Sequence, residues 1–231
     1  MVTLVASGYP GNMIATDIGT RSESKVSRAT QHAESALRDT GQIVVKIGGS
    51  LLYVPNLGMR LRGWLHEHEH CHAVLLAGGG LVADVVRSRD RLDHLGEEKA
   101  HWLAVRALTF TSYLLAGLLE HSAVITCLSE CSAMWAGQRI PILDPYAFLR
   151  RDRSGPEPLP CSWAVTSDSI AARVARVIGA SELVLLKSVS WPSGDVAEAT
   201  RQGIVDQYLA VELARVPDMK VRIENFRGPE L

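Results

Sequence analysis

The sequence predicts an α/β protein in which a three-layer αβα sandwich is built around a mainly parallel sheet. Two observations support this fold class. Short apolar runs alternate along the chain with helical stretches. The first four of these runs are continuous rather than alternating, which is typical of strands that are covered on both faces. Strands that alternate with helices pair in parallel through right-handed crossovers, and these place helices on both sides of the sheet.

The expected elements follow one another from residue 42 onward. Strands are predicted at residues 43–47, 73–76, 123–126, 182–186 and 219–223. Helices are predicted at residues 56–66, 81–92, 97–119, 168–178 and 204–214. Residues 151–160 are charged and rich in proline, so we expect a loop or flap there.

The first part of the chain differs from the rest. Residues 1–41 are rich in Ser and Thr and show no clear apolar periodicity. Such a segment buries too little apolar surface to fold tightly, so we expect a loosely ordered N-terminal extension. The predicted organisation is therefore an extension at residues 1–41 followed by one domain at residues 42–231.

The composition argues against several classes of function. The chain has 231 residues, with 24 Lys and Arg against 25 Asp and Glu, for a net charge of −1. General nucleic-acid binding depends on neutralising phosphates, so a near-neutral chain argues against it. Only 4 cysteines are present, which favours a reducing, cytoplasmic compartment. No signal-peptide pattern is seen, and the most apolar stretch, residues 102–119, contains Arg106 and is short for a membrane span.

Two glycine turns follow the first two expected strands. The first contains Gly48, Gly49 and Ser50, and the second contains Gly78, Gly79 and Gly80. Ligands of open parallel sheets bind at the carboxyl ends of the strands, where glycine lets backbone amides approach an anion closely. Two such turns could hold both ends of a phosphoryl group in transfer, or they could simply be tight turns. Neither the P-loop motif nor the G-x-G-x-x-G motif is present.

Charged side chains stand at three places near these turns. Lys46 interrupts the first apolar strand, and Lys187 ends the apolar run of the fourth. A lysine in a buried strand is costly unless its ammonium group meets an anion or reaches the strand end. Asp168 lies in the first turn of an expected helix, where it can help to cap the helix or orient the lysines. Two cations suit phosphoryl transfer, which depends on positioning and on neutralising negative charge.

Four motifs, in this order, resemble the amino acid kinase superfamily, which includes aspartate, glutamate, acetylglutamate and uridylate kinases. They are VVKIGGSLL, LLAGGG, VTSDSIAARVA and LVLLKSV, and the resemblance covers residues 42–231. It implies an αβα sandwich that transfers the γ-phosphoryl group of ATP to a small anionic acceptor. Mg²⁺ would bridge the phosphates of ATP and be held largely by the nucleotide.

The resemblance also implies roles for individual residues. Lys46 would stabilise the transferring phosphoryl group, and Asp168 would orient the lysines, of which Lys187 is the second. Gly48, Gly49 and Ser50 would cradle the ATP phosphates, and Gly78, Gly79 and Gly80 would hold the acceptor or the γ-phosphate. Arg87, on the helix after the second turn, could clamp an anionic group of the acceptor or belong to a solvated helix face.

The short chain and its segment AHWLAVRAL, residues 100–108, are most similar to the kinase-like proteins of methanofuran and tetrahydromethanopterin biosynthesis. That subgroup implies an acceptor similar to a phosphorylated aminomethylfuran alcohol, which is converted to a diphosphate. One segment departs from the superfamily. Many relatives carry T-D-V-D-G after the fourth strand, whereas this chain has Lys187-Ser188-Val189-Ser190-Trp191. A non-catalytic nucleotide- or oxyanion-binding or storage protein of the same fold is therefore the alternative.

Three further features allow more than one interpretation. Residues 66–72 (HEHEHCH) contain two overlapping H-E-x-x-H matches, but no third ligand follows, so we expect a solvated helix end and no metal site. His101 and Trp102 could contact an acceptor or pack in the core. The apolar helix at residues 103–119 is typical of a subunit interface, so we expect a homo-oligomer, with no nucleic-acid or membrane partner.

Overall fold

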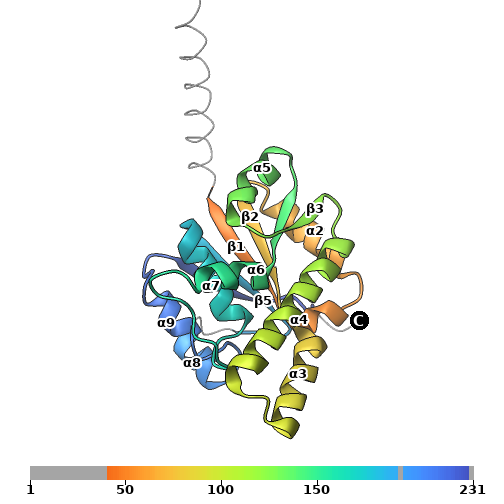
Figure 1. The fold of residues 1–231 in the computed structure, drawn as a ribbon. Helices are drawn as coiled ribbons and strands as arrows, with labels where there is room; N and C mark the ends of the chain where they lie inside the picture. The colour runs from red at the N-terminus through yellow and green to blue at the C-terminus, as the bar shows by residue number, and fades with distance from the viewer. Residues whose placement is uncertain (1–40, 192–194, 229–231) are drawn as a thin grey trace, which may run out of the picture. The chain divides into compact units, whose positions relative to one another are not determined.

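The computed structural model describes residues 41–191 and 195–228 (Figure 1). The extension expected at residues 1–41 lies outside these residues except for Gly41, so its loose order stays a prediction. Within the described part of the chain, no helix combines the length and the apolar character that a membrane span requires.

Six strands form one sheet in the described residues. They are β1 (Gln42–Ile47), β2 (His72–Ala77), β3 (Ser122–Ile125), β4 (Ile140–Leu143), β5 (Glu182–Lys187) and β6 (Lys220–Asn225). Their order across the sheet is β3-β4-β2-β1-β5-β6. The pairings between neighbours are parallel, which confirms the predicted mainly parallel sheet.

The helices are α2 (Leu57–Glu67), α3 (Gly80–Asp93), α4 (Glu97–Leu118), α5 (Cys131–Ala136), α6 (Pro145–Asp152), α7 (Ser167–Ile178), α8 (Val196–Arg201) and α9 (Leu209–Leu213), with short 3₁₀ helices η1 (Gly49–Tyr53) and η2 (Leu128–Glu130). Side chains alternate along β1, so the core has two parts. Val44 packs in the cluster that contains α7, whereas Val45 packs in the cluster that contains α2. Lys46 shares the face of Val44 and therefore points toward α7, which lies in front of β1 in Figure 1.

The topology itself marks a binding position. The chain passes from β1 to β2 on one side and later returns to β5 on the other side of β1. Ligands of open α/β sheets bind outside the carboxyl ends of the strands at such a switch point. Lys46 lies next to the carboxyl end of β1, and Lys187 ends β5. Both lysines therefore lie where the fold favours a ligand.

Two of the expectations about secondary structure are corrected. Sequence reasoning missed β4, because it is short and contains Pro141, which lacks the amide proton that strand pairing uses. The strand persists because it pairs with β3 along its whole length and with β2 at Ile142. The helices α5 and α6 on either side of it were also missed. The single helix expected at residues 204–214 is wrong, since α8 ends at Arg201 and α9 begins at Leu209.

Candidate active site

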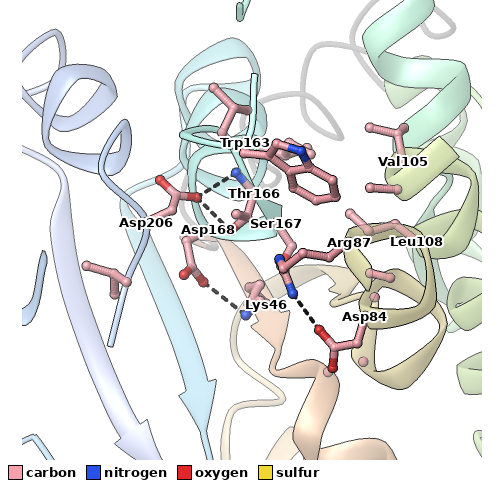
Figure 2. Close-up of a pocket in the computed structure, with 18 of the residues that line it drawn as sticks. Lys46, Asp84, Arg87, Val105, Leu108, Trp163, Thr166, Ser167, Asp168 and Asp206 are labelled. Atoms are coloured by element: carbon pink, nitrogen blue, oxygen red, sulfur yellow. Dashed lines mark hydrogen bonds and ion pairs between the residues drawn. The ribbon is translucent and has the colours of Figure 1, made fainter. Parts of the chain in front are cut away.

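A cavity of about 320 Å³ lies at the carboxyl ends of β1 and β5. Its walls come from the two glycine turns, from α3 and α4, and from the start of α7. Figure 2 shows Trp163 at the upper side of this cavity and Lys46 at the lower side. The sequence-predicted residues that line it are Lys46, Gly49, Ser50, Gly79, Gly80, Arg87, Asp168 and Lys187.

Two lysines from neighbouring strands share one carboxylate. Lys46 Nζ lies 2.9 Å from Asp168 Oδ1. Lys187 Nζ donates to Asp168 Oδ1 and Oδ2 at 2.9 and 2.7 Å. Lys46 and Asp168 are only 4% and 3% exposed. The structure thus brings together three side chains that the sequence places on β1, β5 and α7, and holds them beside the cavity.

The lysine–aspartate cluster carries more positive than negative charge. Burial, reinforced by the neighbouring Lys46, lowers the pKa of Lys187 to about 8. Burial alone would raise the pKa of Asp168, but the two ammonium groups outweigh it, and the pKa lies below its ordinary value. Asp168 therefore stays ionised, and one positive charge is left in excess at neutral pH. A buried excess of positive charge favours the binding of an anion there.

The two glycine turns touch each other through their backbones. A Cβ on Gly78 would lie 2.6 Å from Gly49 N, and a Cβ on Gly49 would clash with Gly80 N. Gly80 also has a φ of +52°, a conformation that favours glycine. Larger residues would push the turns apart, so glycine is what allows bare backbone to line the cavity beside Lys46.

Gly48 and Gly78 have a different use from the one expected. Gly48 N donates to Leu186 O, and Gly78 N donates to Ile47 O, each at 2.8 Å. These two amides are engaged by the sheet, which corrects the expectation that they face an anion. Gly48 and Gly78 instead fix the two turns to the strand ends.

The N-terminus of α7 is capped by a side chain from a remote segment. Asp206 Oδ2 accepts hydrogen bonds from Thr166 N and Oγ1 and from Ser169 N, at 2.9, 2.8 and 3.0 Å. Its Oδ1 accepts from the Ser169 hydroxyl and from the amides of Tyr208 and Leu209. Sequence reasoning missed Asp206, because no local pattern links it to α7. Its carboxylate fixes the helix start that carries Asp168.

Trp163 lies in the loop before α7, where it forms one wall of the cavity and contacts α3. Trp163 Nε1 donates to Asp90 Oδ2 at 2.8 Å, and the guanidinium carbon of Arg87 lies 5.0 Å from the centre of the indole ring. Arg87 also pairs with Asp84 (Figure 2). Arg87 therefore lines the cavity with its charge partly shared, and Trp163 is a second residue that the sequence did not single out.

His101 and Trp102 lie in different environments, one in the cavity and the other packed against a neighbouring helix. His101 lines the cavity from the start of α4, and its Nδ1 lies 3.2 Å from the carbonyl oxygen of Ser162. Trp102 packs against Tyr146 of α6, with ring centres 5.7 Å apart. Only the first of the pair therefore lines this cavity.

The unusual turn after β5 meets the first glycine turn. Ser50 Oγ donates to Ser188 Oγ at 2.9 Å, and Asn225 Nδ2 donates to Ser190 Oγ at 2.9 Å. These hydroxyl contacts tie the turn to the ends of β1 and β6. Residues 188–191 include no acidic side chain, so these hydroxyl groups and not carboxylates are what the turn offers at the strand ends.

The histidine-rich segment contacts both neighbouring residues and other elements, since His68 Nε2 lies 3.2 Å from a guanidinium nitrogen of Arg222 and His72 stacks on Trp135. His68 stacks on Trp64 with ring centres 3.8 Å apart, and His66 Nδ1 lies 3.0 Å from Glu69 Oε2 on exposed side chains. Across residues 41–191 and 195–228, no group of three or more His, Cys, Asp or Glu side chains is placed to hold a metal ion. This segment is thus a helix end followed by a turn.

Comparisons with known structures define the fold of the protein. Uridylate kinase from Archaeoglobus fulgidus gives a TM-score of 0.55 at 19% identity, covering 78% of this chain and 89% of its own. UMP kinase from Bacillus anthracis gives 0.57 at 15%, covering 82% and 88%, and that from Ureaplasma parvum gives 0.58 at 15%, covering 82% and 92%. The chain has the αβα fold of the amino acid kinase superfamily, which confirms the predicted fold class.

A comparison of sequences identifies a more specific relative. The chain is 28% identical over 198 residues to [5-(aminomethyl)furan-3-yl]methyl phosphate kinase of Methanocaldococcus jannaschii, covering 81% of this chain and 89% of that protein. No family model matches the chain. The relative and the fold together confirm the resemblance expected from the motifs, and with it the expected kinase type.

Proposed function

We propose that this chain transfers the γ-phosphoryl group of ATP to the phosphate of a small ester, giving a diphosphate, as part of C1-carrier cofactor biosynthesis. The observation that carries the proposal is the pair of ammonium groups on one buried carboxylate, Lys46 and Lys187 on Asp168, beside two bare glycine turns. A cavity of about 320 Å³ suits a small molecule. The ester named for the M. jannaschii relative is the acceptor class we favour.

The proposed reaction needs no side-chain nucleophile. An oxygen of the acceptor phosphate attacks the γ-phosphorus of ATP, the bond to the β–γ bridging oxygen breaks, and ADP leaves. Negative charge spreads over the phosphoryl oxygens in the transition state. Lys46 and Lys187 would stabilise that charge, and Asp168 would hold both ammonium groups in position.

The cavity supports a division between donor and acceptor. Gly49 and Ser50 would contact the ATP phosphates at the end of β1. Gly79 and Gly80 would hold the acceptor phosphate or the γ-phosphate at the start of α3, where the first amides of the helix lack intrahelical partners. Arg87, two turns further along α3, would meet the body of the acceptor.

Mg²⁺ would come to the site bound to ATP. Both oxygens of Asp168 are engaged by lysine ammonium groups, and no cluster of three or more metal-binding side chains exists among the residues that the structure describes. The nucleotide would therefore supply most ligands of the ion. The ion would in turn neutralise negative charge on the phosphates of the nucleotide.

The test is turnover with a defined acceptor. The purified chain is incubated with ATP, Mg²⁺ and [5-(aminomethyl)furan-3-yl]methyl phosphate, and both ADP release and diphosphate formation are measured. The unphosphorylated alcohol is the control. We expect the diphosphate from the phosphate ester and no product from the alcohol. Failure to form a diphosphate from any phosphate ester tested would contradict the proposal.

The second candidate is a non-catalytic nucleotide- or oxyanion-binding protein of the same fold. The observation that favours it is the turn at residues 188–191, which lacks the acidic residues of many relatives. Calorimetry with ATP separates the two candidates, because saturable binding without ADP release would support this one.

Exposed apolar side chains support the expected homo-oligomer. On α4, Leu103, Phe110 and Leu114 are 39%, 58% and 44% exposed. A stripe of such residues is costly in water and favours a covered surface. Light scattering on the wild type and on Phe110→Glu tests this, since the substitution should shift the mass toward the monomer.

A cytoplasmic setting is also part of the proposal. It would supply ATP, and its reducing conditions suit the free thiols of Cys71, Cys127, Cys131 and Cys161.

A further inference from the structure

The cavity changes its character along α4. Leu108 lies beside the second glycine turn, since a Cβ on Gly79 would meet its Cδ1 at 3.0 Å. Val105, Ala104 and His101 then line the cavity toward the start of the helix. With a rise of about 1.5 Å per residue, His101 lies about 10 Å along α4 from Leu108. The polar glycine turn and His101 therefore stand at separate places, with apolar wall between them.

His101 offers the cavity a hydrogen-bond acceptor. Its Nδ1 lies 3.2 Å from the carbonyl oxygen of Ser162, and because a carbonyl can only accept, Nδ1 carries the ring proton. Burial lowers the pKa of His101 and outweighs the hydrogen bond to Ser162, which acts in the opposite direction, so the ring is neutral near pH 7. The other nitrogen, Nε2, then has a lone pair and no proton. It can accept a hydrogen bond but cannot donate one.

We propose that Nε2 of His101 accepts a hydrogen bond from an amine, or a similar donor, on the acceptor molecule and thereby selects which phosphate ester is phosphorylated. This inference rests on the proposed function, and it makes His101 a specificity-determining residue. The donor group would lie at the end of the acceptor opposite its phosphate, because the phosphate is held beside Lys46 and the glycine turns.

The walls between these two places fit a flat molecule. Val105 and Leu108 face the cavity from α4, and Trp163 faces it from the loop before α7 (Figure 2). A single ring stacked on the indole, with a phosphate-bearing methylene on one side and an aminomethyl group on the other, would reach both polar places. The ester named for the M. jannaschii relative has this arrangement.

The test compares two substrates on the same enzyme. The first is [5-(aminomethyl)furan-3-yl]methyl phosphate, and the second is (5-methylfuran-3-yl)methyl phosphate, which lacks the amine. We expect the wild type to favour the amine by about 10- to 100-fold in kcat/KM, the size of one buried hydrogen bond to a charged group. In His101→Phe, which keeps a ring but removes Nε2, the ratio should fall close to one, mainly through KM of the amine.

A matched variant supplies the rescue. His101→Gln can place its amide oxygen near the position of Nε2, so part of the preference should return. Because the ratio is taken within each variant, a general loss of stability does not change it. Equal use of both esters by the wild type, or a full preference in His101→Phe, would overturn the role of His101 and leave the kinase proposal standing. Turnover of neither ester would overturn both.

Discussion

The two ends of the cavity are built from different parts of the fold. The proposed phosphoryl end, defined by Lys46, Asp168 and Lys187, stands on two central strands and on the start of a helix. The proposed acceptor end, defined by Arg87, His101 and Trp163, stands on α3, on the start of α4 and on the loop before α7. At the phosphoryl end, buried ion pairs hold each charge in place. At the acceptor end, the charge of Arg87 pairs with Asp84 and lies beside the indole ring of Trp163. Single hydrogen bonds orient the rings of Trp163 and His101.

This difference in construction suggests that the proposed phosphoryl transfer and the proposed recognition of the acceptor depend on different parts of the fold. Neighbouring strands of a parallel sheet fix the positions of their ends, so a charge cluster placed there is rigid and costly to change. A loop and two helix surfaces can change their side chains without changing the sheet. We therefore expect substitutions at the phosphoryl end to lower kcat, and substitutions at the acceptor end to raise KM.

The largest effect should come from Lys46→Ala. Removing this ammonium group takes away charge that stabilises the transition state, so kcat should fall by about 10³-fold. Lys187 still neutralises Asp168 in the variant, and the melting temperature should change little. Steady-state kinetics and thermal unfolding measure the two quantities. The matched control is Lys220→Ala on β6, whose side chain is 68% exposed and should not affect turnover. An unchanged kcat in Lys46→Ala would remove Lys46 from the mechanism.

Asp168→Asn should damage both stability and rate. The substitution leaves two buried ammonium groups without a carboxylate, which costs about 3–5 kcal/mol of unfolding free energy for a broken buried pair. The misplaced lysines should also lower kcat by about 10²-fold. Urea unfolding at pH 7 and at pH 9.5 is the measurement. The loss of stability should be smaller at pH 9.5, because Lys187, with a pKa of about 8, can then be neutral. The same loss at both pH values would contradict this electrostatic account.

The sequence predicts the phosphoryl end far better than the acceptor end. Lys46 and Lys187 each interrupt or end an apolar run, and such a break is visible in the sequence without a structure. Trp163 and Asp206 carry no such signal, because their partners Asp90 and Ser169 lie on other elements. The expected helix at residues 204–214 failed for a related reason, since the carboxylate of Asp206 turns this segment around the start of α7.

Prediction of the fold from the sequence was limited in the same way, because some elements depend on neighbours that are remote in the chain. Continuous apolar runs were enough to place β1, β2 and β5, which form the centre of the sheet. The four-residue strand β4 was hidden by its proline, and only its position between β2 and β3 gives it a partner on each side. Local pattern thus identifies strands that carry an apolar run of their own, the edge strands β3 and β6 included. It does not identify elements that exist because of a particular neighbour.

Trp163→Ala tests the acceptor end. The variant loses the stacking surface and the hydrogen bond to Asp90, so KM for the acceptor should rise about tenfold, the value of one stacked aromatic contact. The kcat value should stay within a factor of about two, since Lys46 and Asp168 are not touched. Trp163→Phe keeps a ring and should recover most of the KM. A fall in kcat with an unchanged KM would show that the two ends are not separate in function.

The smallest effect concerns pH. In the proposed mechanism the ammonium form of Lys187 is the active one, and the pKa of this group is lowered to about 8 by burial and by Lys46. The value of kcat/KM should therefore be highest below this pKa and fall as pH rises through it, by roughly fourfold between pH 7 and pH 8.5. A bound phosphate favours the charged form and raises the pKa, so kcat should fall only at higher pH.

Lys187→Arg isolates this group, because a guanidinium stays charged across the whole range. Its kcat/KM should lose the basic limb, whatever its absolute rate. If the limb near pH 8 persists in Lys187→Arg, another group is responsible for it. The pKa of about 8 at Lys187 would then not control the pH dependence of the reaction.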